Sequence, residues 1–151
     1  MSDFSHIGED GSVRMVDVSA KPILARIAKA SGVIRMAPET VRLIQENRIA
    51  KGNVLATAKI AAIQAAKRTA EWIPLCHPLS LTGIEVEFEV GESEIRIICE
   101  ARIAAQTGVE MEALTAVSAA ALTLYDMCKA VDKGMVIADI RLVSKEKRTL
   151  S

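Results

Sequence analysis

The sequence predicts an α+β protein, a ferredoxin-like two-layer domain in which an antiparallel sheet packs against helices. Three observations support this fold class. Two segments of alternating apolar and polar residues, 81–90 and 95–103, are joined by Gly91-Glu92-Ser93, as is typical of a β-hairpin. A long uncharged helical run follows them, and an alternating segment at 135–143 returns as a final strand. A hairpin, a helix and a returning strand together make a two-layer α+β domain.

The N-terminal region is predicted in three pieces. Residues 1–12 hold glycines among mixed polar residues and are predicted to form a mobile arm. Residues 13–18 alternate as a short strand would. The segment 23–36 is ambiguous, because its Ala and Lys residues favour a helix whereas Gly32-Val33-Ile34 favours a strand with a bulge, and we favour the strand. A single catalytic domain is expected over 13–145, with a C-terminal tail over 146–151.

Two helices are predicted in the next part of the chain. Pro38 suits a first helical position, and the apolar residues after it predict a short helix that ends near Asn47. A turn is expected at Lys51-Gly52. Asn53 is then a suitable N-cap for a second helix that reaches about Glu71, because its side chain can accept a hydrogen bond from the first helical turn.

The stretch 107–129 predicts a core helix. Thirteen uncharged residues, mostly Ala and Leu, separate Glu112 from Asp126. Without a polar stripe this helix should be packed on nearly every side, and it is too short to span a membrane. Its two carboxylates should lie about 21 Å apart along the axis, too far for one small-molecule site. Because so small a chain can hide such a helix only with help, we infer a second subunit and sites between copies.

Composition excludes several functional classes. The chain has 151 residues, with 50% hydrophobic and 25% charged residues, which suits one soluble domain with a real core. Nineteen basic and nineteen acidic residues cancel, and only 3% are aromatic, which argues against nucleic-acid binding. We find no signal peptide or membrane span, and three widely spaced cysteines without a CxxC suit reduced thiols. We therefore expect a cytoplasmic protein.

Cys76 and His77 are candidate site residues in a stretch, 72–78, that is predicted to be irregular. Pro74 and Pro78 stiffen the backbone on both sides and so fix where the imidazole points, which suits ligand binding. A histidine held only by hydrogen bonds within the protein is an equal alternative. A zinc deaminase is disfavoured, because its HxE and PCxxC spacings are missing from the sequence, and no metal site is predicted.

Charged residues near the long helix are further candidates. Asp126 and Lys129 are three apart and share a helix face, so they form either a surface ion pair or a catalytic pair whose pKa values are shifted by burial. Glu110 and Glu112 lie where a helix dipole favours carboxylates, so they are helix-capping residues or site residues. Lys51 precedes a glycine that lets the backbone approach a ligand, although most such turns have no ligand.

Four segments together resemble the family of molybdenum cofactor biosynthesis protein C, the cyclic pyranopterin monophosphate synthases. The resemblance covers about 15–145, and the long run from Thr107 is its most specific part. It implies a lyase that converts a cyclised dihydro-GTP intermediate to cyclic pyranopterin monophosphate and releases pyrophosphate. No redox cofactor is implied, Mg²⁺ is compatible, and the family assembles as a hexamer, a trimer of dimers. The segments are MVDVS from Met15, Lys51-Gly52, IPLCHPL from Ile73, and TGVEMEALTAVSAAALTLYDMCKAVDKGMVI from Thr107.

The resemblance also implies which residues are catalytic and which bind the substrate. Its catalytic lysines fall on Lys51 and Lys129, and its catalytic aspartate falls on Asp126. We assign both lysines to proton transfer, Asp126 to orienting Lys129, His77 to phosphate contact and Glu112 to base or ribose recognition. The full substrate-binding set is Leu75, Cys76, His77, Glu110, Met111, Glu112, Lys67 and Lys145.

One part of the chain departs from the family. A glycine- and lysine-rich end is usual there, but this chain has Ser144-Lys145-Glu146-Lys147-Arg148, in which Lys145 still matches the family's first lysine. A closing loop over a triphosphate is therefore in doubt. Two other classes remain alternatives: a nucleotide-sensing binding module, which needs no lysine with a shifted pKa, and a purely structural oligomer, which binds no guanosine nucleotide.

Overall fold

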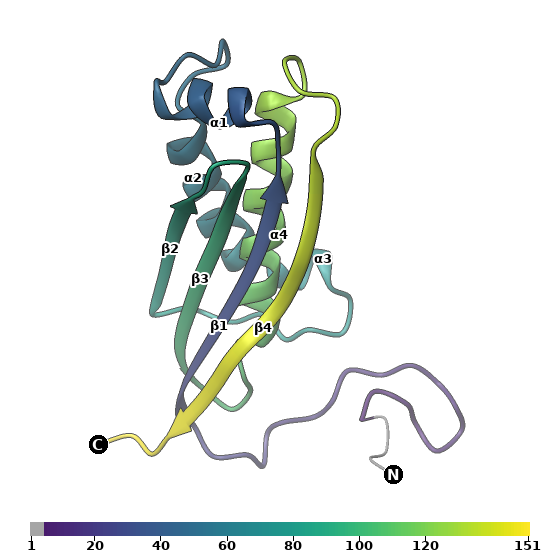
Figure 1. The fold of residues 1–151 in the computed structure, drawn as a ribbon. Coiled ribbons are helices and arrows are strands. Elements are labelled where there is room, and N and C mark those ends of the chain that lie inside the picture. The colour runs from purple at the N-terminus through teal and green to yellow at the C-terminus, as the bar shows by residue number, and fades with distance from the viewer. Residues whose placement is uncertain (1–4) are drawn as a thin grey trace.

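The computed structural model describes residues 5–151 and has the predicted α+β architecture (Figure 1). The sheet has the strand order β2-β3-β1-β4, and every neighbouring pair of strands is antiparallel. This order and the element sequence are those of a ferredoxin-like domain, which confirms the predicted fold class. Within residues 5–151, no helix is long and apolar enough to cross a membrane. The elements are β1 (Leu24–Arg35), α1 (Pro38–Gln45), α2 (Val54–Lys67), α3 (Thr69–Trp72), β2 (Gly83–Val90), β3 (Glu94–Ala105), α4 (Glu110–Cys128) and β4 (Val136–Arg148).

The hairpin of β2 and β3 and the ambiguous N-terminal strand are both confirmed. The strand β1 lies between β3 and β4 in the sheet, so both of its edges are hydrogen bonded and the helical alternative is excluded. The bulge expected at Gly32 also exists, because the pairing with β4 shifts register between Ser31 and Val33. A Cβ at Gly32 would lie 2.7 Å from Cγ1 of Val117, so only glycine lets α4 lie this close to the sheet.

Two predictions about the chain ends were wrong. Residues 13–18 form no strand: Val13 makes an isolated bridge to Ile7, and residues 14–18 pair with no strand. At the other end, β4 continues to Arg148, which pairs with Ala25, so the predicted tail of 146–151 begins inside a strand. The long central strand β1 offers backbone partners that far, and the local sequence gave no sign of this. Part of the predicted mobile arm, residues 1–4, lies outside the described residues.

The predicted helices form with one change in their bounds. The side chain of Asn53 accepts a hydrogen bond from Ala56 N (3.0 Å), which confirms it as the N-cap of α2. The helical stretch predicted to reach Glu71 is interrupted at Arg68, and α3 follows as a separate turn. Of the stretch 72–78 that was predicted to be irregular, residues 73–78 are so, whereas Trp72 is the last residue of α3.

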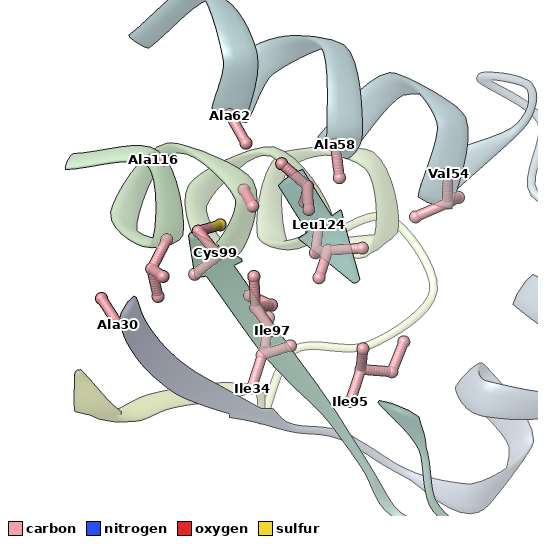
Figure 2. Close-up of a cluster of buried hydrophobic side chains, with 14 of the residues drawn as sticks. Ala30, Ile34, Val54, Ala58, Ala62, Ile95, Ile97, Cys99, Ala116 and Leu124 are labelled. Carbon is pink, nitrogen blue, oxygen red and sulfur yellow. The ribbon is translucent and has the colours of Figure 1, made fainter. Parts of the chain in front are cut away.

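The long helix α4 packs against α2 and against strands β1, β3 and β4 of the sheet, and α2 also contacts β2 (Figure 2). Small residues on both helices, among them Ala58, Ala62 and Ala116, are fully buried and let the two helix backbones approach closely. The expectation that a second subunit is needed to bury α4 was therefore wrong for most of its surface, because α2 and the sheet already cover it. A strip remains uncovered, in which Leu122 is 53% exposed.

The centre of this core sets the first testable prediction. Leu124 is fully buried in α4, among the side chains that join the helices to the sheet. We expect Leu124→Ala to lower the free energy of unfolding by about 2–5 kcal/mol, through lost apolar burial and the cavity left behind. Urea unfolding followed by circular dichroism measures this. Ile60→Ala in α2 is the control, since Ile60 is 58% exposed, and it should change stability by less than about 1 kcal/mol. Equal losses of unfolding free energy in both variants would contradict the central position of Leu124 in the core.

Candidate active site

The three predicted catalytic residues meet at the C-terminal end of α4. Lys51 Nζ donates to the backbone carbonyl of Asp126 (2.9 Å) and to its Oδ2 (3.1 Å), and Lys129 Nζ lies 2.9 Å from Oδ1. Each carboxylate oxygen therefore faces one lysine. We call Lys51, Asp126 and Lys129 the lysine cluster. Lys51 comes from the loop between α1 and α2, where the next residue, Gly52, has φ 112°, a backbone conformation that favours glycine.

A clamp between α1 and the turn after α4 supports this arrangement. The first turn of α1 has no side-chain cap of its own. Asp132 Oδ2 instead accepts hydrogen bonds from Ala37 N and from the buried Thr40 hydroxyl, both at 2.9 Å. These bonds join the start of α1 to the end of α4. The loop that follows α1 can therefore present Lys51 to Asp126.

The electrostatics of the lysine cluster favour one of the two alternatives for Asp126 and Lys129. Hydrogen bonds from Lys129 and Lys51 lower the pKa of Asp126, and the hydrogen bond to Asp126 raises the pKa of Lys129. In the single chain they form a surface ion pair, because the side chains of Lys129 and Asp126 are 56% and 58% exposed. Burial therefore does not shift these pKa values toward catalytic use in the single chain.

The second group of predicted residues surrounds a cavity at the other end of α4. This cavity, the loop cavity, has a volume of about 250 Å³. The N-terminal segment, the loop between α3 and β2, and the first turn of α4 form its wall. Six predicted residues line it: Leu75, Cys76, His77, Glu110, Met111 and Glu112. His6, Val16, Val18, Lys21 and Gly108 line it too and were missed, although Val16, Val18 and Gly108 lie in segments that carry the family resemblance.

His77 holds the N-terminal segment against the loop cavity. Its Nε2 lies 2.6 Å from the backbone carbonyl of Val16, so the ring N–H donates across 61 positions of sequence. The pKa of Asp17 is lowered mainly by the hydrogen bond from the side chain of Ser19, and the nearby His77 makes a smaller contribution to this lowering. Both alternatives for His77 thus meet here: it is satisfied within the protein and it lines a cavity. Among residues 5–151, no three His, Cys, Asp or Glu side chains gather as metal ligands.

Glu112 is the buried acid of the loop cavity. It is only 4% exposed, and burial raises its pKa to about 7, with a smaller contribution from the charge of Glu110. Burial and Glu112 together raise the pKa of the neighbouring Cys76 thiol, which makes that thiol a poor nucleophile. No side chain caps α4 at Val109, but Glu110 and Glu112 both lie in the first turn of α4, so a favourable interaction with the helix dipole remains an alternative role for them. A carboxyl group that titrates near neutral pH suits acid and base catalysis.

The pKa of Glu112 gives a second prediction. Its folded-state pKa is raised, so its contribution to stability is complete below about pH 4.5 and is lost as the pH rises through about 7. We expect the wild type to lose about 1–2 kcal/mol of unfolding free energy over this range from Glu112, after allowance for solvent screening. Glu112→Gln should remove that loss. Urea unfolding of both proteins at several pH values tests this, and parallel pH curves would contradict it.

The remaining two predicted residues lie at this same end of the molecule. Lys145 Nζ is 3.8 Å from Oε1 of Glu110, beside a cavity of about 190 Å³ that we call the strand cavity. Lys67, at the end of α2, lines a smaller cavity that Glu112 also lines. The strand cavity adds two cations that the sequence analysis missed. Its lining residues are Arg26, Ile27, Gly108, Val109, Glu110, Lys145, Glu146 and Lys147.

The two groups cannot serve one site within a single chain. Asp126 comes sixteen positions after Glu110 along α4, a distance of about 24 Å at 1.5 Å per residue. The structure therefore confirms the separation expected from the sequence. It divides the eleven predicted residues into three in the lysine cluster and eight around the cavities at the opposite end.

The fold and these two groups define a small α+β protein whose grouped basic and acidic side chains suit a charged small molecule. The sequence profile of the MoaC family matches residues 15–148, and the chain belongs to this family.

Three relatives illustrate the similarity. The "Cyclic pyranopterin monophosphate synthase" of Desulforapulum autotrophicum is 55% identical and that of Desulfatibacillum aliphaticivorans 57%; both matches cover 96% of this chain, and 90% and 92% of those proteins. The "Molybdenum cofactor biosynthesis bifunctional protein" of Chlorobaculum tepidum is 58% identical over 95% of this chain but only 46% of its own length.

Proposed function

We propose that this protein is a cyclic pyranopterin monophosphate synthase. The reaction would convert the cyclised dihydro-GTP intermediate to cyclic pyranopterin monophosphate with release of pyrophosphate, in molybdenum cofactor biosynthesis. The family membership and the names of the relatives support this assignment. The observation that carries it is the pairing of Lys51 and Lys129 on the two oxygens of Asp126, at the positions of the family's catalytic residues.

The chemistry requires the residue types found in the two groups. Formation of a cyclic phosphate needs a hydroxyl to attack the α-phosphorus while pyrophosphate leaves, so cations must stabilise the charge on phosphate oxygens. Lys145 and His77 are suited to this contact, and His77 must release Val16 to make it. Ring opening and closure need proton transfer, which we assign to Lys51 and Lys129, oriented by Asp126. Glu112 is assigned to recognition of the base or ribose.

Assembly of two chains would unite the groups. A site that uses all the predicted residues needs the lysine cluster of one chain beside the cavities of another, because about 24 Å separates them within one chain. We propose a dimeric unit of this kind, repeated three times in a hexamer. The partly exposed apolar strip of α4 around Leu122 is available for such a contact. Burial in this interface would also desolvate Lys129. The assembly is proposed to work in the cytoplasm.

A direct assay tests the function. The protein is incubated with the product of the upstream radical enzyme, and both the pterin and pyrophosphate are measured. We expect the two products to form in equal amounts without a redox cofactor, and an arm with EDTA determines whether Mg²⁺ is needed. Saturable binding of the intermediate without either product would favour the alternative, a nucleotide-sensing module. Absence of both binding and turnover would favour a structural role.

A further inference from the structure

The side chain of Glu110 lies where the loop cavity and the strand cavity adjoin each other. Gly108 and Glu110 line both cavities, and no other residue of their linings is shared. A Cβ built on Gly108 would overlap both carboxylate oxygens of Glu110 and would lie 2.7 Å from its Cδ. The carboxylate therefore folds back onto the glycine, and its position depends on the absence of a side chain there.

The contact that keeps the carboxylate in place is weak. Lys145 Nζ lies 3.8 Å from Oε1 of Glu110, and the two side chains are 68% and 32% exposed. An ion pair of this length and exposure contributes little to stability. An anion that offers Lys145 more charge than one carboxylate can therefore displace Glu110 at small cost.

The backbone around this carboxylate is held more firmly. Arg26 donates from Nε to the carbonyl of Ala105 (3.1 Å) and from Nη2 to that of Gln106 (3.3 Å). These bonds tie the loop that precedes α4 to strand β1, and Glu110 itself begins the helix. A movement that unites the cavities therefore needs only rotation of the Glu110 side chain, which has three rotatable bonds.

We propose that Glu110 is a movable partition, which leaves Gly108 when an anionic ligand takes its place on Lys145 and so joins the two cavities into one trough. The inference rests on the proposed function for the identity of the natural ligand, a nucleotide-derived polyphosphate. It gives Glu110 a positioning role that differs from direct substrate contact. In the ligand-free protein, Glu110 neutralises Lys145 and occupies space that a long ligand needs.

The charge part of the proposal is tested with inorganic pyrophosphate by isothermal titration calorimetry. Glu110→Gln keeps the size of the side chain but removes the negative charge that pairs with Lys145. We therefore expect pyrophosphate affinity to rise about fivefold, the effect of one charge at about 4 Å in water. Glu46→Gln is the matched control, since Glu46 is also an ion-paired carboxylate, 3.0 Å from Arg48, but lines neither cavity, and it should leave affinity unchanged. The gain should vanish when Lys145→Gln is added. Wild-type affinity in Glu110→Gln, an equal gain in Glu46→Gln, or a gain that survives Lys145→Gln overturns the proposal.

The partition part is tested by ligand length. Pyrophosphate fits one cavity, whereas GTP needs more space, so truncation by Glu110→Ala should improve GTP affinity more than Glu110→Gln does. The two variants should bind pyrophosphate equally. Gly108→Ala forces the Glu110 carboxylate from its position and should raise affinity for both pyrophosphate and GTP. If the Gly108→Ala protein does not fold, the comparison of the two Glu110 variants still tests the partition. If Glu110→Ala and Glu110→Gln have the same effect on GTP, the partition is overturned.

These binding results are independent of the proposed reaction. If the Glu110 variants gain affinity as expected but the wild type forms no pterin, the partition is supported and the proposed function is wrong. If the wild type forms the pterin but the Glu110 variants bind with unchanged affinity, the proposed function is supported and the partition is wrong.

Discussion

Replacement of Lys129 by alanine should lower pterin formation by about 10²–10⁴-fold, the contribution typical of a positioned acid or base. The reason lies in the lysine cluster, where Lys129 Nζ lies 2.9 Å from one oxygen of Asp126 and is the residue to which we assign proton transfer. Lys129→Arg should be nearly as inactive, because a guanidinium keeps the charge but does not release its proton near neutral pH. Initial rates of pterin and pyrophosphate formation measure both variants.

The control for this experiment is Lys133→Ala. Lys133 is an exposed lysine in the turn after α4 and should retain wild-type activity. Light scattering should give all three variants the same oligomeric mass as the wild type. Retained turnover in Lys129→Ala would remove this residue from the chemistry. Activity in Lys129→Arg alone would assign it to charge stabilisation.

Two inactive variants should restore each other if the site lies between chains. One is Lys129→Ala, and the other is His77→Ala, which damages the loop cavity at the opposite end of α4. A mixed dimer contains one site with both defects and one site with none. Random pairing makes half of the dimers mixed, so about a quarter of wild-type activity should return on co-expression.

The controls separate this result from simple stabilisation. Each variant alone, at the same total concentration, should stay inactive. A chain that carries both substitutions should restore no activity when it is co-expressed with either single variant. Co-purification through two different tags confirms that mixed assemblies exist. Mixed assemblies without recovered activity would contradict a shared site, and the lysine cluster and the cavities would then act separately.

Much of the fold was accessible from local patterns. The hairpin of β2 and β3, the N-cap at Asn53 and the long helix α4 follow from alternation, capping and helix propensity, which act over a few residues. The strand β1 was ambiguous because its sequence suits both a helix and a strand. Only its two neighbours in the sheet, which belong to segments far along the chain, made it a strand.

The errors have the same physical origin. A strand needs a partner, so residues 13–18 failed to form one while β4 extended to Arg148 along β1. The burial of α4 was assigned to a second subunit because the sequence does not reveal that α2 presents small residues to it. The sequence left open whether burial shifts the pKa of Lys129, and the position of this lysine at an exposed helix end lets the hydrogen bond to Asp126 dominate.

The sequence by itself determined the fold class, the residues that carry the family resemblance and the separation of Glu112 from Asp126, because helix rise fixes distances along one element. Only the tertiary structure decided that Lys51 reaches Asp126 and that Lys145 lies beside Glu110. It also revealed Glu112 as an acid with a pKa of about 7. These features depend on packing between segments distant in the chain, which sets both side-chain contacts and access to water.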